Sequence, residues 1–130
     1  MTYIPKKGTP QMYKKRAIKV LKATLELFDS PEKWTKECSA RDSLNRPTAF
    51  YAPDARCFCI TAAVHRNVHQ LYKQRAVQSN LLAYIFATMD YLTNNKDKSI
   101  VDFNDNPRTT FNGMIRMIHK TIRTIEKETI

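Results

Sequence analysis

Glycine scarcity most constrains what this chain can fold into: among 130 residues, glycine occurs only at Gly8 and Gly113. All-β sandwiches and barrels need many tight turns with positive φ, and glycine supplies most of them. The sequence therefore predicts an all-α fold, with a single compact helical domain of about four to five helices over residues 9–130. Residues 1–8 lack hydrophobic periodicity, so we expect them to form a mobile N-terminal tail.

Helical periodicity in the first half of the chain predicts three elements. Thr9 and Pro10 have the cap-then-proline pattern of a helix start, and the same pattern at Ser30–Pro31 predicts a short helix holding Trp34. Residues 38–53 have no period and contain prolines, so we expect an ordered loop that packs over the core. Asp54 is a good N-cap residue and is predicted to open the next helix.

The second half continues with two more periodic stripes. The stripe beginning at Ile60 loses phase near residues 73–78, which predicts a break between two helices, the second ending at Asn94–Asn95. A short apolar segment follows at residues 100–103, either extended or one helical turn. Asn106 or Thr109 is predicted to cap the last helix, which has the cleanest period of the chain. Its stripe consists of Phe111, Ile115, Ile118, Ile122 and Ile125.

The formal charge is +10, and its distribution is uneven. Residues 1–28 carry a net +6, residues 54–75 and 108–130 carry +3 each, and residues 76–107 carry −2. Such asymmetry suits an anionic partner, of which nucleic acid is the commonest, although a basic surface also serves solubility alone. The candidate anion-binding residues lie on the first predicted helix: Lys14, Lys15, Arg16, Lys19 and Lys22.

The chain has no apolar run near the roughly 18 residues of a membrane span and no secretory leader pattern. Its three cysteines, Cys38, Cys57 and Cys59, are an odd number without regular spacing. Reduced thiols in a cytoplasm are therefore the expectation, with no membrane partner.

Three patches stand out by their order and spacing. The first is Trp34 followed by Ala40-Arg41-Asp42, and the second runs from Ala55 through Cys59 to Ala62-Ala63-Val64. The third is Phe103-Asn104-Asp105 leading into Thr109 or Thr110. Together they resemble an uncharacterised family of short helical proteins from bacteria and their phages. The resemblance spans roughly residues 17–125 and implies an architecture and a bacterial or phage setting, in the host cytoplasm if the chain is phage-encoded, with no activity attached. Ala62 stands where the family usually has glycine.

The patch residues admit a structural and a functional interpretation. Asn104 and Asp105 precede a helix and are first of all capping residues, and they could interlock with Arg41 and Asp42. The alternative is a small-ligand pocket, or a thiol enzyme in which Cys59 is activated near a helix N-terminus. His65 or His119 would then act as its base, but no local signature of a thiol enzyme surrounds the cysteine.

A metal site is the remaining candidate. His65 and His69 are four residues apart and share a helix face, which is correct spacing for two zinc ligands. Their segment lacks the glutamate of a zinc protease, and Cys57 and Cys59 would diverge on a helix. We therefore expect no metal, and no cofactor, since the chain also lacks a glycine-rich phosphate loop.

The sequence thus favours a small, basic, non-enzymatic binding protein that engages nucleic acid or a nucleoprotein machine. The first alternative is a phage-type interaction factor that inhibits or recruits a host protein complex. The second is a small-ligand binder or thiol enzyme that uses the Arg41, Cys59 and Asp105 patch.

Overall fold

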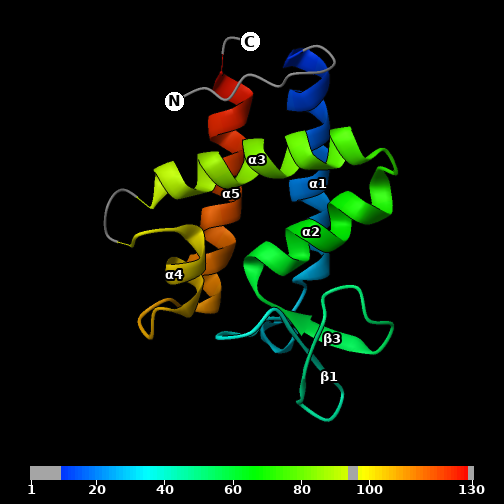
Figure 1. Cartoon of the computed structure of the whole chain (residues 1–130). Helices are drawn as coiled ribbons and strands as arrows, with labels where there is room; N and C mark the ends of the chain where they lie inside the picture. The colour runs from blue at the N-terminus through cyan, green and yellow to red at the C-terminus, as the bar shows by residue number, and fades with distance from the viewer. Residues whose placement is uncertain (1–9, 94–96, 129–130) are drawn as a thin grey trace.

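A computed structural model describes residues 10–93 and 97–128. The described chain is mostly helical, as predicted, with five α-helices, one 3₁₀ helix and one small sheet (Figure 1). The elements in order are α1 (Pro10–Leu27), η1 (Pro31–Lys33), β1 (Ala40–Asp42), β2 (Pro47–Thr48), β3 (Ala55–Phe58), α2 (Ile60–Leu71), α3 (Arg75–Leu92), α4 (Ile100–Asp105) and α5 (Phe111–Lys127).

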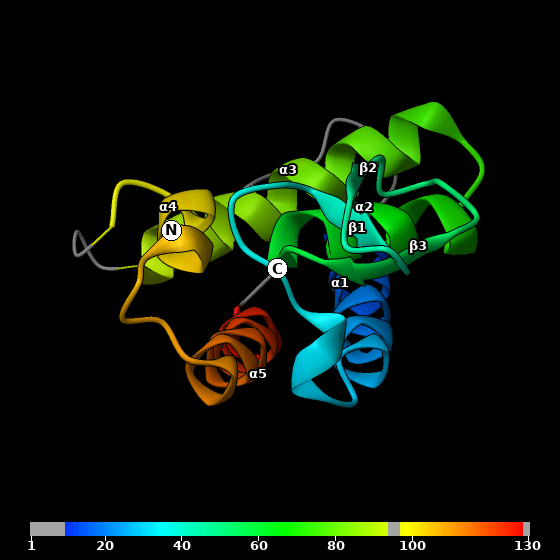
Figure 2. The ribbon, with the colours of Figure 1, turned by 90° about the horizontal axis from the view of Figure 1, so that it is seen from below.

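The helices form two layers around one hydrophobic core. Helices α1 and α5 run antiparallel side by side, α3 crosses both of them on one side, and α2 crosses α1 on the same side (Figures 1 and 2). Lys14 joins the start of α1 to the end of α5 by donating from Nζ to the carbonyl oxygen of Glu128 at 2.7 Å. The predicted stripe of α5 is buried at Ile118, Ile122 and Ile125, and Ile118 and Ile125 have no exposed surface. In the first turns of α5, Phe111 and Ile115 are only half-buried, and Met114 and Met117 face the core instead.

Polar groups inside the core are paired with one another across the helices. Asn67 on α2 donates from Nδ2 to Thr24 Oγ1 on α1 at 3.0 Å, and Asn80 on α3 donates to Tyr13 Oη on α1 at 3.1 Å. An unpaired buried polar group costs free energy, so these bonds favour one arrangement of α1 against α2 and α3.

The all-α prediction is wrong in one segment, because residues 40–58 contain a three-stranded antiparallel sheet in the order β2-β1-β3. Ala40 on the central strand lies opposite Thr48 on β2 and Phe58 on β3. The predicted ordered loop is therefore partly a sheet. Glu37 and Asn45 adopt positive φ, at 69° and 63°, so non-glycine residues here supply the backbone conformations that glycine usually provides.

Several helix boundaries differ from the predicted ones. Helix α2 begins at Ile60 with Cys59 as its N-cap, because the residues after Asp54 pair with β1 as strand β3 instead of starting a helix. The segment after Lys98 forms the helix α4, and Thr110 caps α5 in place of Asn106 or Thr109. The break between α2 and α3 is confirmed.

Two predictions fall outside the described residues: the mobile tail at residues 1–8 and the helix end at Asn94–Asn95. Among the described residues, none of the helices combines the length and the apolar character that crossing a membrane requires.

Candidate functional site

The outer face of α1 carries a lysine ridge, defined here as Lys15, Lys19 and Lys22. These residues lie at spacings of four and three, all three are exposed, and they are opposite the buried Tyr13, Ala17 and Val20 side of the helix. In residues 10–93 and 97–128, the ion pairs are Lys33–Asp29 and Arg46–Asp42, so none neutralises the ridge.

The two other cations predicted on α1 have structural partners. Lys14 is half-buried and bonded to Glu128, and the Arg16 guanidinium lies 5.0 Å from the centroid of the Tyr72 ring. A cation over an aromatic face is attracted to it, so Arg16 stabilises the packing of α1 against the end of α2. Three of the five predicted anion-binding residues thus remain on the ridge.

Sequence reasoning missed a second basic ridge, defined here as Arg116, Lys120 and Arg123 on α5. It has the same spacings of four and three, and its three side chains are exposed. The signal was present in the sequence, since α5 has the cleanest apolar stripe and the cations occupy the opposite face.

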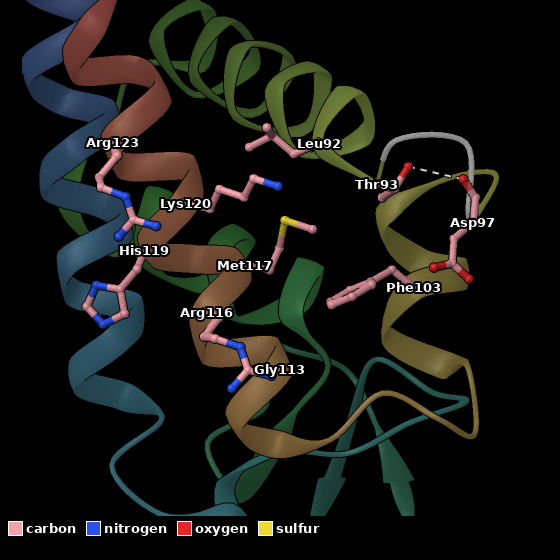
Figure 3. Close-up of a pocket in the computed structure, with 10 residues that line it drawn as sticks. All are labelled: Leu92, Thr93, Asp97, Phe103, Gly113, Arg116, Met117, His119, Lys120 and Arg123. Atoms are coloured by element: carbon pink, nitrogen blue, oxygen red, sulfur yellow. Dashed lines mark hydrogen bonds between the residues drawn. The ribbon is translucent and has the colours of Figure 1, made fainter.

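Beside the α5 ridge lies an open groove of about 700 Å³ between α5, α4 and the end of α3. In Figure 3, Phe103 from α4 and Met117 from α5 point toward one another across it, and Leu92 closes its upper end. Lys120 extends toward Leu92, whereas Arg123 and His119 extend from the side of α5 nearer α1 (Figure 3). The groove therefore has an apolar floor and a cationic border.

The family-pattern residues form a hydrogen-bonded hub around Asn104, which is 1% exposed. Its Oδ1 accepts from Trp34 Nε1 at 2.7 Å and from the Ile60 amide at 3.0 Å. Its Nδ2 donates to the Thr35 carbonyl at 3.1 Å and to Asp105 Oδ1 at 3.0 Å. One side chain thus joins α4, the start of α2 and the segment before β1.

The predicted direct bonds between the Arg41–Asp42 pair and the Asn104–Asp105 pair are not formed among the described residues, and the two pairs are connected only through residues 35–37. Arg41 donates from Nε to Thr35 Oγ1 at 3.0 Å, next to the carbonyl that Asn104 binds, and Asp105 accepts from the Glu37 amide at 2.8 Å. Asp42 instead bonds Leu44 and Arg46 in the turn that follows β1.

The turn at Asp42 explains the state of its carboxylate. Asp42 Oδ1 accepts from the Arg46 and Leu44 amides, both at 2.9 Å, and Oδ2 accepts from Arg46 Nε at 3.0 Å. The Arg46 amide, with smaller contributions from the Arg46 side chain and the Leu44 amide, holds the pKa of Asp42 below its usual value, although burial acts in the opposite direction.

Cys59 occupies the N-cap of α2, where its sulfur accepts from the Ala62 amide at 3.4 Å. It lines a small hollow of about 230 Å³ together with Cys38 and Asp105. The described lining of this hollow includes no histidine, because His119 borders the α5 groove and His65 packs elsewhere. Neither of the two histidines predicted as a base for Cys59 therefore lines this hollow.

His65 and His69 share a face of α2, as predicted, with ring centroids 6.2 Å apart and an interplanar angle of 16°. Phe50 and Phe86 pack against the His65 ring, whose buried Nδ1 has no hydrogen-bond partner among the described residues. This burial, with a smaller effect from His69, lowers the pKa of His65 below its usual value. The described residues hold no cluster of three or more metal-ligating side chains.

Together, the fold and these surfaces define a small, mostly helical domain with a three-stranded sheet and two outward-facing basic ridges. The chain belongs to the family of unknown function DUF6197, whose family model matches residues 12–124. The predicted resemblance to an uncharacterised family is thereby confirmed. No curated protein and no solved structure matches the chain significantly.

Proposed function

We propose that this protein is a non-enzymatic binding protein that engages nucleic acid through the lysine ridge of α1. The observation that supports the proposal best is the ridge itself: three exposed, regularly spaced ammonium groups on a helix whose opposite face is anchored in the core. Phosphate groups are the natural partners of such a row, since each contact releases condensed counterions.

The charge of the whole chain supports the same partner. The +10 net charge produces a positive field that attracts polyanions over distances longer than a single contact. The three cysteines are free thiols, which suits a reducing compartment, so we place the interaction in a cytoplasm, that of a host if the chain is phage-encoded.

The decisive test replaces Lys15, Lys19 and Lys22 by Gln, which retains helix propensity. We expect the triple variant to bind all nucleic-acid sequences more weakly. It should also lose up to about two to three units of the slope of log affinity against log salt, since each duplex phosphate contact contributes about −0.9. Fluorescence anisotropy with labelled oligonucleotides across a salt series measures both quantities.

A matched control removes the same number of charges away from α1. Lys33 on η1, Arg56 on β3 and Lys98 before α4 are the positions, each changed to Gln. This control should retain most of the salt slope of the parent protein. Equal losses in the two variants would show that net charge alone drives binding and would reject the ridge as the site.

A protein partner is the second candidate, favoured by an apolar hollow of about 490 Å³ beside the lysine ridge. Ile18, Ala23 and Leu71 line it, and Leu71 is 37% exposed. Lys19 and Lys22 border it together with one carboxylate, Glu26. An acidic surface of a host complex would suit this combination of apolar and cationic groups. If the parent protein binds no nucleic acid at low salt, the nucleic-acid proposal fails and this candidate takes its place.

A further inference from the structure

The groove beside α5 brings three kinds of contact together: an apolar floor, cations and a carboxylate. Its floor is apolar and includes an aromatic ring, Phe103. Its border carries the cations Arg116 and Lys120. On the α4 side it has a carboxylate, Asp97, whose Oδ1 accepts from Asn106 Nδ2 at 3.1 Å.

We propose that this groove holds one unpaired nucleotide, with the base against Phe103 and Met117 and the phosphate on Arg116 and Lys120. Aromatic rings provide stacking platforms for any base, because every base has a π-face. The guanidinium of Arg116 can bind two phosphate oxygens at once, and the Lys120 ammonium adds a point charge one helical turn further. The proposal deepens the proposed function, since it names unpaired nucleic acid as the substrate class.

Asp97 favours a nucleotide over an acidic peptide as the occupant. A carboxylate accepts hydrogen bonds from the exocyclic amino group of a base, and Asp97 has acceptor capacity beyond the bond that Asn106 makes. A nucleotide carries its charge on the phosphate and leaves a neutral base to face Asp97, whereas a peptide with several carboxylates would place a like charge beside it. The volume of about 700 Å³ lies within the range of small-molecule sites and fits a single nucleotide unit.

Because a base must lie on the Phe103 ring, the groove should bind single-stranded and not double-stranded nucleic acid. Bases in a duplex are covered by their neighbours on both sides, so they cannot also lie on Phe103. An unpaired strand can place a base in the groove and continue toward Arg123, which extends from the side of α5 nearer α1 (Figure 3).

The experiment compares four probes: a single strand of eight nucleotides, its duplex, the same strand with abasic sites, and adenosine monophosphate alone. The parent protein should bind the single strand about tenfold more tightly than the duplex or the abasic strand, which lacks the stacking contact. Because the abasic arm needs no protein variant, it tests stacking even where a substitution disturbs folding.

The variant Phe103→Leu retains an apolar floor but removes the aromatic face. It should weaken single-strand binding about tenfold and leave duplex binding unchanged. The double variant Arg116→Gln with Lys120→Gln should weaken both the strand and free adenosine monophosphate. The Lys33, Arg56 and Lys98 variant serves as the charge control.

The outcomes separate this proposal from the proposed function. Equal affinity for strand, duplex and abasic strand, unchanged by Phe103→Leu, would overturn the groove proposal and leave phosphate binding by the lysine ridge intact. If free adenosine monophosphate binds as tightly as the single strand, and if this binding depends on Phe103, the groove proposal is supported and the ligand of the groove is a free nucleotide. Binding of an acidic amphipathic peptide in the groove without any nucleotide binding would overturn both.

Discussion

At the scale of single residues, Asn104 contributes most to the arrangement of the chain. Its two acceptor bonds and two donor bonds involve groups separated by up to 70 positions in sequence. Asparagine is suited to this position because its amide offers both an acceptor oxygen and two donor hydrogens. The family pattern therefore marks a structural hub at this position.

Asn104→Ala should destabilise the fold by about 3–5 kcal/mol, because it leaves the Trp34 indole, the Ile60 amide and the Thr35 carbonyl without their partner. Urea unfolding measures the change. Asn112→Ala, at an exposed position in the first turn of α5, is the matched control and should cause no loss of stability. If the free energy of unfolding of Asn104→Ala falls by less than about 1 kcal/mol, water molecules take over the hydrogen bonds of the Asn104 side chain.

His65 should make stability depend on pH. Burial lowers its folded pKa, whereas in the unfolded chain the value is about 6.5. The unfolded state therefore binds the proton more readily, and the stability from neutral His65 is complete above about pH 6.5 and is lost as pH falls through the folded pKa. His65→Phe retains the ring packing with Phe50 and Phe86 and should flatten the melting temperature between about pH 7 and 5.

The comparison needs a histidine that is exposed, and His119 on α5 provides it. His119→Gln should retain the pH dependence of the parent protein. If both variants show the same pH dependence of the melting temperature as the parent protein, carboxylates and not His65 cause the loss of stability at acid pH.

At the scale of secondary structure elements, α5 is held in place by a buried face that packs against α1 and α3. Ile118 lies in the middle of its buried stripe and has no exposed surface. Ile118→Ala should cost about 2–4 kcal/mol, because the substitution removes buried surface and leaves a cavity. His119→Ala, at the next position but on the exposed face, should change stability by less than about 0.5 kcal/mol. Denaturant unfolding of the two variants compares the buried and the exposed face of α5. Similar losses in the free energy of unfolding would contradict the burial of Ile118.

Long periodic elements were predictable from sequence, whereas short ones were not. The stripes of α1, α3 and α5 extend over four or more turns, so the period of 3.6 is evident. Strands of three, two and four residues are too short to show alternation. The prediction of a helix start at Asp54 was wrong because N-cap preference is a local property, whereas the pairing of β3 with β1 is a tertiary contact.

In the candidate site, too, local patterns were predictable from sequence and tertiary contacts were not. The exposed lysines of α1 followed from helical spacing, because the apolar stripe of the helix determines its opposite face. The groove beside α5 joins Leu92, Phe103 and Met117 from three helices, and no spacing within a single segment shows that they meet. The partners of Lys14 and Arg16 likewise depend on tertiary packing.

At the scale of the whole molecule, the +10 charge opposes folding through self-repulsion. Raising sodium chloride from about 0.01 to 0.15 M shortens the Debye length from about 30 to 8 Å, so the melting temperature should rise by about 2–5 °C. The variant with Gln at Lys15, Lys19 and Lys22 should show a smaller rise. Differential scanning calorimetry checks both, and a melting temperature that falls with salt would contradict the repulsion.

Trp34 has a consequence for how folding of this chain can be observed. It is the single tryptophan, so the chain has one indole emitter, and that indole is bonded to Asn104, flanked by Phe111 and covered by Lys36 at 5.1 Å. These neighbours come from α4, α5 and the segment before β1, so the emission reports their joint docking. The protein thus contains its own optical probe for these long-range contacts, and stopped-flow fluorescence can follow their formation without any added label.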